Sequence, residues 1–288
     1  MSVVRSPAEL EPTDRAVAIG TFDGVHRGHR AAIETAKEAG SRSTVVTFEP
    51  HPRLVLGYDV QLLTTLRRRI ELLEEVGPDD ILVLEFTNDL SQLEPEDFVA
   101  EILEPIGTKT VVAAEDFRFG QGRKGDIDLL RRLGIAVVDV PLVEGVSSSR
   151  IRELLSAGEM REAAALLGRP HELEGTVVSG DQRGGTLGFP TANLAAERHL
   201  LVPAFGIYAG AALGGRAAIS IGVNPHYGGS ERRIEAFLLD FEGDLYGQKL
   251  RIELWERLRD ERAFESEEAL IRQIALDVEA ARAAARPS

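Results

Sequence analysis

The order of apolar and polar positions divides the chain into two parts with different periods. From Ala16 to about Asp139, short apolar runs alternate with segments of helical spacing. The runs predict strands and the segments between them predict helices. The strands are Ala16–Ile19, Thr44–Phe48, Ile81–Phe86, Thr110–Ala114 and Ile135–Val140, and the helices are Arg30–Ala39, Thr64–Val76, Pro95–Leu103 and Ile127–Leu133. Continuously apolar strands between helices predict an α/β domain with a parallel sheet covered on both faces.

Residues at the ends of these helices support their limits. Thr64 suits the N-cap of the second helix, and Gly77 suits its C-terminal end. Pro95 suits the first turn of the third helix.

The pattern changes near residue 168. Two short predicted helices, Ser149–Ser156 and Glu159–Leu167, end at Gly168-Arg169-Pro170, which breaks the helical spacing. We therefore expect one domain over residues 1–168 and a second over residues 169–288.

The second domain consists of short β-like runs between glycine and proline turns. The runs are Leu173–Val178, Gly206–Ala212, Arg216–Val223, Arg233–Phe241 and Lys249–Leu254. This spacing predicts a small antiparallel barrel. A terminal helix over Ser266–Ala285 carries one apolar stripe, which we expect to pack on the barrel rather than to bind a ligand.

Composition narrows the class of protein. With 288 residues, 43% of them hydrophobic and 28% charged, the chain suits two medium soluble domains. No apolar run is long enough to span a membrane, the N-terminus lacks the apolar core of a signal peptide, and no cysteine is present, which together favour the cytoplasm. The net charge of −14 argues against nucleic acid as a ligand but is compatible with a local nucleotide site.

The stretch from Gly20 to His29 lies between the first predicted strand and the first predicted helix. This order directs helix amides and the positive end of the helix dipole at a ligand in the turn. Glycines such as Gly24 let the backbone approach a phosphate closely. His26 and His29 can face one side and donate hydrogen bonds to phosphate oxygens. The alternatives are a metal-binding pair or two surface histidines.

Further loops follow other predicted strands, and ligands bind beyond the carboxyl ends of parallel strands. His51, held between two prolines, can reach a phosphate or is incidental to a rigid turn. Phe117 and Phe119 offer a surface to a planar ring, and Arg118 between them can pair with phosphate or stack. The alternative for this loop is that the aromatic residues only anchor it.

A serine-rich segment, Ser147-Ser148-Ser149, begins the helix after the last strand of the first domain. Serines at this position cap a helix and can donate to an anion. Arg150 can then bind an outgoing pyrophosphate. Simple capping, with the arginine on the solvent face, is the alternative.

The second domain carries its own polar motif, Gly188-Phe189-Pro190-Thr191-Ala192-Asn193. The Thr191 hydroxyl and the Asn193 amide can point to one site, and their oxygens suit Mg²⁺ bound with ATP phosphates. A glycine-rich stretch from Gly180 to Gly185 precedes them, as in phosphate-binding loops. Glu235 alternates with apolar residues on a predicted strand, so it faces either solvent or a site where it is the candidate base. For the Thr191 motif, a structural turn is the alternative.

Together these segments resemble the prokaryotic bifunctional riboflavin kinase/FMN adenylyltransferases, often called FAD synthetases. His26 to His29 reads His-x-Gly-His, the signature of the nucleotidyltransferase superfamily. Thr47–Pro52 fits Thr-Phe-x-Pro-His-Pro, and Ser147–Arg152 fits Ser-Ser-Thr-x-Ile-Arg with serine in place of threonine. Gly188–Asn193 matches the riboflavin kinase motif Gly-x-Pro-Thr-Ala-Asn, and the resemblance extends from about Val17 to Arg282.

The resemblance implies a Rossmann-like nucleotidyltransferase domain followed by a β-barrel riboflavin kinase domain. The second domain would phosphorylate riboflavin to FMN, and the first would adenylylate FMN to FAD, each with ATP as co-substrate and Mg²⁺ as cofactor. It implies catalytic roles for Glu235, His26, His29 and Arg150, nucleotide contacts for Gly20, Phe22, Asp23, Gly24, Ser148, Gly184 and Gly188, flavin contacts for His51, Asp116, Phe117, Arg118 and Phe189, and metal contacts for Thr191 and Asn193.

The sequence departs from the family pattern at Ala114 and Gly185, where glycine and arginine are usual, and at His226, where threonine is usual. Another nucleotidyltransferase of the superfamily would not explain the Thr191–Asn193 and Glu235 segments. Two further alternatives are an FMN adenylyltransferase with an impaired kinase domain and a non-enzymatic regulator that binds flavin or nucleotide. The sequence is compatible with a homo-oligomer.

Overall fold

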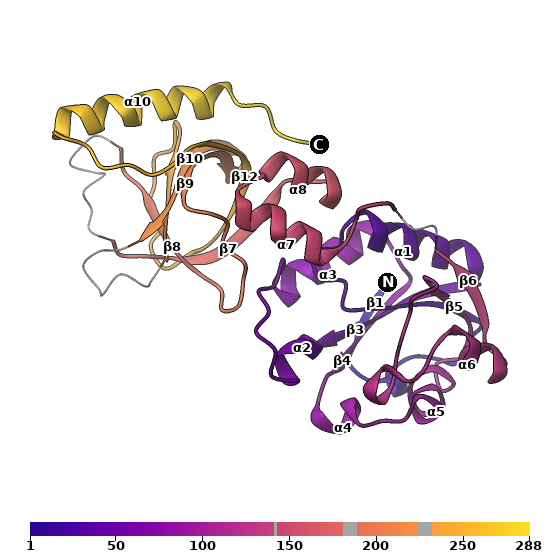
Figure 1. Ribbon diagram of the computed structural model, residues 1–288. Helices are drawn as coiled ribbons and strands as arrows, with labels where there is room; N and C mark the ends of the chain where they lie inside the picture. The colour runs from indigo at the N-terminus through magenta and orange to yellow at the C-terminus, as the bar shows by residue number, and fades with distance from the viewer. Residues whose placement is uncertain (141–142, 181–188, 224–231) are drawn as a thin grey trace. The chain divides into compact units, whose positions relative to one another are not determined.

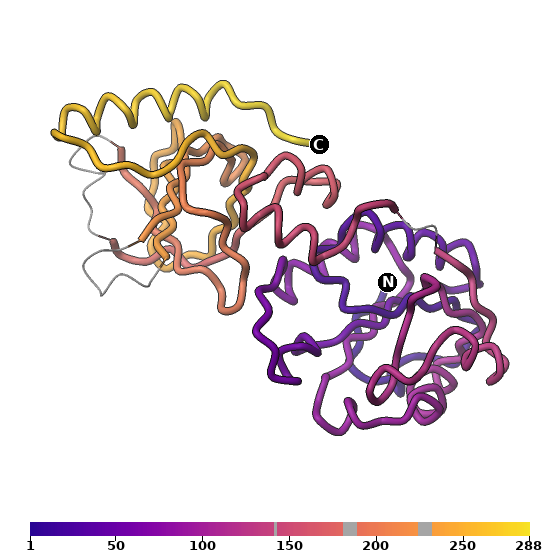
Figure 2. The backbone as a smooth tube through the Cα atoms, viewed as in Figure 1, coloured from indigo at the N-terminus to yellow at the C-terminus, as the bar shows by residue number. Residues whose placement is uncertain are grey.

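The computed structural model describes residues 1–140, 143–180, 189–223 and 232–288. Figures 1 and 2 show its two compact units. The sheet unit comprises Met1–Val60 and Leu66–Val146, and the barrel unit comprises Gln61–Thr65 and Ser147–Ser288. Within the described residues, none of the helices has the length and apolar character needed to cross a bilayer.

The sheet unit is built on a six-stranded sheet whose neighbouring strands are all parallel, in the order β1-β4-β3-β2-β5-β6. The strands are β1 (Ser2–Val4), β2 (Arg15–Ile19), β3 (Arg42–Glu49), β4 (Asp80–Glu85), β5 (Thr108–Ala113) and β6 (Ala136–Asp139). The chain continues from β2 to β3 on one side, whereas β5 lies on the other side, so the strand order reverses at β2. Ligands bind beyond the carboxyl ends of strands at such a reversal. The loop that begins at Gly20 leaves β2 at this point.

Helices cover both faces of this sheet. Ala18 lies in one core with residues of α1 (Arg27–Ala39) and α3 (Leu66–Val76). Val17, its neighbour on β2, lies in the opposite core with residues of α5 (Pro95–Phe98), the π-helical segment Val99–Leu103 that continues it, and α6 (Ile127–Arg132). Because successive strand residues point to opposite faces, both faces of β2 are buried and its sequence is continuously apolar.

The predicted strands and long helices of this unit are confirmed, with differences at their ends. Helix α1 begins at Arg27 rather than Arg30, because Nδ1 of His26 caps it by accepting from the His29 amide. Helix α3 begins at Leu66 rather than at Thr64, and Gly77 (φ +82°) follows its last residue, as predicted. Strand β1 and the four-residue helices α2 (Pro52–Val55) and α4 (Asn88–Ser91) were not predicted, because each is too short to show a period.

The barrel unit contains the small antiparallel barrel expected from the sequence. Its strands are β7 (His171–Val178), β8 (Ala192–Ala196), β9 (Gly206–Ala212), β10 (Gly215–Val223), β11 (Arg232–Leu238) and β12 (Lys249–Arg259), closed in the order β10-β11-β8-β7-β12-β9. Strand β8 was not predicted, since its sequence reads as a turn. It forms because β7 and β11 pair with it on either side.

Helices α7 (Ser148–Ala157) and α8 (Met160–Leu167) pack on the barrel, where Ile151, Leu155 and Met160 are buried in its core. The compact division therefore falls before these helices, and the domain boundary expected after residue 168 stays a prediction. The terminal helix α10 (Glu267–Ala283) also packs on the barrel, as predicted. Asp277 of this helix pairs with Arg259 of β12, with an Oδ2–Nη2 distance of 2.7 Å.

The segment Gln61–Thr65 belongs to the barrel unit although its neighbours in sequence belong to the sheet unit. The Leu62 amide donates to the His199 carbonyl (2.6 Å), and the Leu201 amide donates to the Leu62 carbonyl (2.8 Å). Leu63 is 2% exposed within the barrel core. The Thr65 hydroxyl donates to the Glu174 carboxylate at 2.5 Å. This segment is therefore an integral part of the barrel unit.

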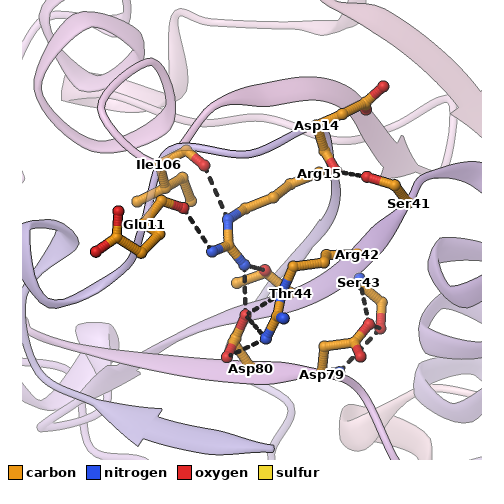
Figure 3. A network of polar contacts seen from close by, with 10 residues as sticks. All are labelled: Glu11, Asp14, Arg15, Ser41, Arg42, Ser43, Thr44, Asp79, Asp80 and Ile106. Atoms are coloured by element: carbon orange, nitrogen blue, oxygen red, sulfur yellow. Dashed lines mark hydrogen bonds and ion pairs between the residues drawn. The ribbon is translucent and has the colours of Figure 1, made fainter.

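A buried polar network lies at the amino ends of the parallel strands (Figure 3). Arg15, 2% exposed, pairs with Asp80 and donates to the Thr44 hydroxyl (3.0 Å) and to the Ile106 carbonyl (2.8 Å). Arg42 also pairs with Asp80 (3.1 Å). Since buried charges are tolerated only when paired, this network holds the end of the sheet opposite to the Gly20 loop.

Candidate active sites

The loop after β2 brings His26 and His29 into direct contact. Their rings stack with centroids 3.5 Å apart and planes at 14°, and the Phe22 ring lies 5.1 Å from that of His29. His26 is 6% exposed, and its Nδ1 accepts from the His29 amide at 3.2 Å. A neutral His26 therefore carries its proton on Nε2, from which it can be donated.

The backbone of this loop has an unusual conformation. Phe22 (φ +50°), Gly24 (φ +86°) and Val25 (φ +40°) lie in the left-handed region, which is unfavourable for phenylalanine and valine. A side chain at Gly28 would approach the His26 ring to 3.3 Å, so glycine lets the ring lie against the first turn of α1. The surrounding structure must hold this loop in place. Asp23, predicted to contact nucleotide, is 1% exposed within it.

A buried arginine, Arg69 of α3, joins this loop to the end of β3. It donates to the Thr21 carbonyl (2.9 Å), the Phe48 carbonyl (3.0 Å) and the Glu49 carboxylate (2.6 Å). Burial lowers the pKa of Arg69, whereas the carboxylates of Glu49 and Asp23 act to raise it. Arg69 was not among the site residues predicted from the sequence. Its spacing, three residues after Leu66 and four before Leu73, could have placed it on the apolar face of α3.

His51 follows β3 and caps α2, where its Nδ1 accepts from the Arg53 amide at 3.2 Å. Its side chain is 5% exposed. His51 and the His26–His29 pair thus follow the carboxyl ends of two neighbouring strands of one sheet.

The loop after β5 carries Asp116, Phe117 and Arg118. Phe117 and Phe119 stack with centroids 5.7 Å apart, and Phe119 is buried in the core of the sheet unit. Arg118 donates to the Phe117 carbonyl of its own loop at 2.7 Å, and Asp116 is exposed. Phe119 thus anchors the loop, while the flavin contacts expected of the other three residues stay predictions.

Ser148 and Arg150 lie in the first turn of α7, in the barrel unit. Ser147 caps this helix by accepting from the Arg150 amide at 3.1 Å. The Arg150 side chain is exposed and pairs with Glu153 at 2.9 Å. Ser147 caps the helix as expected, and the contacts of Ser148 and Arg150 with phosphate stay predictions.

In the barrel unit the predicted metal ligands and the predicted base lie together. The Thr191 hydroxyl donates to Glu235 Oε2 at 3.2 Å, and Glu235 lies opposite Asn193 in the pairing of β11 with β8. Arg233 Nε lies 2.5 Å from Glu235 Oε1 and donates to Asn193 Oδ1 at 3.1 Å. Arg233 was predicted only as the first residue of a strand and not as a site residue, although it precedes Glu235 by two residues and so shares its face of the strand.

Gly180 makes room for this cluster. A Cβ atom at this position would lie 2.3 Å from the Asn193 side-chain nitrogen, which no ordinary contact allows. The predicted contact residues Gly184 and Gly188, and the departures from the family pattern at Gly185 and His226, lie outside the described residues.

Two cavities share Thr191 as a lining residue. One, of about 330 Å³, lies between the barrel and α10 and is lined by Phe189, Phe237, Glu235, Ile274 and Val278 among others. The other, of about 150 Å³, is lined by Tyr246, Phe241, Asp244 and Leu245 among others. Thr191 lines both cavities, and Glu235 lines the larger one.

A second carboxylate faces the larger cavity. Burial raises the pKa of Glu261, and the Glu235 carboxylate also raises it, whereas the Arg259 guanidinium opposes them.

Comparisons with known proteins agree with this division into two sites. The family model for FAD synthetase matches residues 8–152, and the family model for riboflavin kinase matches residues 167–285. A crystal structure described as a macrolide-efflux protein from Streptococcus pneumoniae superimposes with a TM-score of 0.88 at 30% identity, covering 98% of this chain and 99% of that one.

Curated relatives match over nearly the whole chain. The bifunctional riboflavin kinase/FMN adenylyltransferase of Listeria monocytogenes is 36% identical, over 96% of this chain and 94% of that protein. The protein of the same name from Pseudomonas fluorescens is 38% identical, over 100% of this chain and 99% of that protein. The chain therefore belongs to the family of bifunctional riboflavin kinase/FMN adenylyltransferases.

Proposed function

We propose that this protein phosphorylates riboflavin to FMN in its barrel unit and adenylylates FMN to FAD at the His26–His29 loop. The observation that carries the proposal is the meeting of Thr191, Asn193 and Glu235 beside two cavities. This arrangement gives a flavin and a nucleotide one common point of contact with a candidate base.

In the kinase site, riboflavin occupies the larger cavity, where Phe189 and Phe237 offer aromatic surface to its ring system. ATP occupies the smaller cavity. As the 5′-oxygen of riboflavin bonds to the γ-phosphorus, the bond from that phosphorus to ADP breaks, and Glu235 accepts the hydroxyl proton. Such transfers depend on positioning and charge stabilisation.

The oxygens at this point suit Mg²⁺, the expected cofactor. Thr191 offers a hydroxyl and Asn193 an amide oxygen, which are hard ligands. An amide oxygen has two lone pairs, so Asn193 can bind a cation and still accept from Arg233. When bound, Mg²⁺ neutralises charge on the ATP phosphates.

In the adenylyltransferase site, a phosphate oxygen of FMN attacks the α-phosphorus of ATP and pyrophosphate leaves. Gly20, Phe22, Asp23 and Gly24 form the nucleotide loop, and His26 and His29 donate to the phosphates. Ser148 and Arg150 bind the leaving pyrophosphate. His51, Asp116, Phe117 and Arg118 contact the flavin end. Charge stabilisation by such donors is a large part of catalysis, and no protein nucleophile is needed.

The ligands of the protein are then riboflavin, FMN, FAD and ATP. We place both reactions in the cytoplasm, where ATP is available as the co-substrate of each.

Two variants assayed in parallel test the proposal. Glu235→Gln should lower kcat for FMN formation by about 10²–10⁴-fold and leave FAD formation from supplied FMN unchanged, because only the kinase loses its base. His29→Ala keeps the backbone amide at residue 29. This amide still donates its hydrogen bond to Nδ1 of His26, so the helix cap is preserved. It should abolish FAD formation and leave FMN formation largely intact.

The assay resolves FMN from FAD by chromatography over time, with riboflavin, ATP and Mg²⁺ supplied. Each variant is the control for the other. Loss of both activities in a folded His29→Ala protein would contradict two separate sites, and unchanged kinase turnover in Glu235→Gln would remove the role of Glu235. FAD made by the wild type only from supplied FMN would favour the alternative of an impaired kinase.

A further inference from the structure

Arg69 is a buried cation that no step of the proposed chemistry uses. It is 2% exposed, and its guanidinium makes hydrogen bonds to two separate segments of the sheet unit. One segment is the start of the loop after β2, through the Thr21 carbonyl. The other is the end of β3, through the Phe48 carbonyl and the Glu49 carboxylate. One side chain thus ties the carboxyl ends of two neighbouring strands.

These two segments carry the histidines of the adenylyltransferase site. The loop after β2 leads to His26, and the end of β3 leads to His51. The first loop also contains Phe22 and Val25 with positive φ, a conformation that persists only where the surroundings fix it. Besides Arg69, the Thr47 hydroxyl donates to the Thr21 carbonyl at 3.1 Å.

The chemistry of arginine suits this role. A guanidinium is planar and presents several donors in fixed directions, so it can hold three acceptors at once. A lysine ammonium at the end of a flexible chain can keep the charge but cannot reproduce the fork. The Glu49 and Asp23 carboxylates balance the buried charge.

We propose that Arg69 is a positioning residue for adenylyl transfer, fixing the loop that carries His26 and His29 relative to the segment that carries His51. This inference rests on the proposed FMN adenylyltransferase function of the sheet unit. Small displacements of groups that act on a transferring phosphoryl group are costly, since a shift of about 1 Å can lower the rate by about 10²-fold.

Arg15 provides a matched control at the opposite end of the same sheet (Figure 3). It is also 2% exposed, and it also binds backbone carbonyls and a carboxylate. Because Arg15 is the first residue of β2, it lies away from the loop that leaves the other end of that strand. Replacing either arginine disturbs a buried charge network in the same unit, but only Arg69 contacts the loop.

The test compares Arg69→Lys and Arg69→Met with Arg15→Lys in the full-length protein, below the unfolding temperature of each. For FAD formation from FMN, Arg69→Lys should lower kcat about 10–100-fold, with KM for FMN and ATP changed less than about threefold. Arg69→Met should lower kcat further. FMN formation should stay within about twofold of wild type in all three variants, and Arg15→Lys should also keep FAD turnover within about twofold.

Amide hydrogen exchange provides a readout that does not depend on activity. Residues 20–26 and 49–51 should exchange faster in Arg69→Lys than in wild type or Arg15→Lys. Wild-type FAD turnover in Arg69→Lys, or an equal loss in Arg15→Lys, would overturn the inference, and so would unchanged exchange of the loop. If the wild type made no FAD, the proposed function would fail, while the exchange data would still decide whether Arg69 holds the loop. If Arg69→Met does not fold, Arg69→Lys carries the test.

Discussion

At the scale of single residues, His171 shows how burial changes a titrating group. It begins β7 and is 2% exposed. Burial, assisted by the nearby Arg169 guanidinium, lowers the pKa of His171 from 6.5 to about 3, in spite of a hydrogen bond with the Leu201 backbone. Folded His171 is therefore neutral over most of the pH range in which it is protonated in the unfolded chain.

This shift predicts acid sensitivity. Between pH 6.5 and about 3 the unfolded state binds more protons at His171, so stability falls as the pH falls. The contribution of this residue should reach about 1.4 kcal/mol per pH unit within that window. His171→Gln cannot titrate and should unfold with a weaker pH dependence, measured by denaturant titration from pH 7 to pH 4.

Exposed His199, on the same unit, is the control, because replacing it removes an imidazole without changing the buried core. It has a φ of +63°, which asparagine tolerates, so His199→Asn is the matched variant. Equal pH dependence in wild type and His171→Gln would contradict the prediction.

At the scale of elements, α10 forms a wall of the larger cavity through Leu270, Ile274, Asp277 and Val278. One of the contacts between this helix and the barrel is the pair of Asp277 with Arg259, whose side chains are 8% and 19% exposed. Asp277→Asn leaves the Arg259 charge without its partner, at a cost of about 1–3 kcal/mol. We expect KM for riboflavin to rise about 3–10-fold, which corresponds to part of this free-energy cost. The amide hydrogens of α10 should also exchange faster.

A second ion pair on α10 gives the matched control. Arg282 pairs with Asp240 at 2.7 Å, and both side chains are exposed. Exposed pairs contribute little to stability, so Asp240→Asn should leave α10 exchange and the KM for riboflavin as in wild type. Similar effects of the two substitutions would show that Asp277 has no special part in holding the helix.

Elements also show which parts of this structure a sequence predicts. Runs such as the one in β2 are apolar because both sheet faces are buried, so local pattern is enough. Strand β8 pairs with β7 on one side and β11 on the other. The sequence around Thr191–Asn193 has no alternating apolar pattern of its own, so this strand could not be predicted from it. The same register places Asn193 opposite Glu235. The motifs therefore predicted which residues to consider, while the register of the strands determined which of them meet.

The contacts of buried arginines are a second feature that the sequence pattern does not predict. Arg67, Arg68 and Arg69 are consecutive in α3, and Arg69 is buried where it meets three acceptors from other segments. The helical period could have placed Arg69 on the apolar face of α3. It could not have shown what Arg69 binds, because its partners lie far away in the sequence.

At the scale of the whole molecule, Leu63 belongs to the barrel unit, although the chain before Gln61 and after Thr65 belongs to the sheet unit. Leu63→Ala opens space in the barrel core and should lower the stability of the barrel unit by about 2–5 kcal/mol. Trp255, the only tryptophan, is 5% exposed on β12 and reports on this unit. Its fluorescence during urea unfolding should show a lower midpoint in Leu63→Ala.

Leu72, fully buried on α3 of the sheet unit, is the control for Leu63. Leu72→Ala removes the same atoms from the other core and should shift the Trp255 transition less. An equal shift in both variants would argue against a specific role of Leu63 in the barrel.

The course of the chain through Gln61–Thr65 has a consequence for recombination between relatives. Because these five residues belong to the barrel unit, the chain passes from one unit to the other at residues 60/61, 65/66 and 146/147. A single crossover at residue 147 would join a foreign barrel to a pentapeptide that evolved with the original one. Chimaeras that carry residues 61–65 together with their own barrel should fold better than single-crossover chimaeras, so two distant stretches of the gene are inherited as one structural unit.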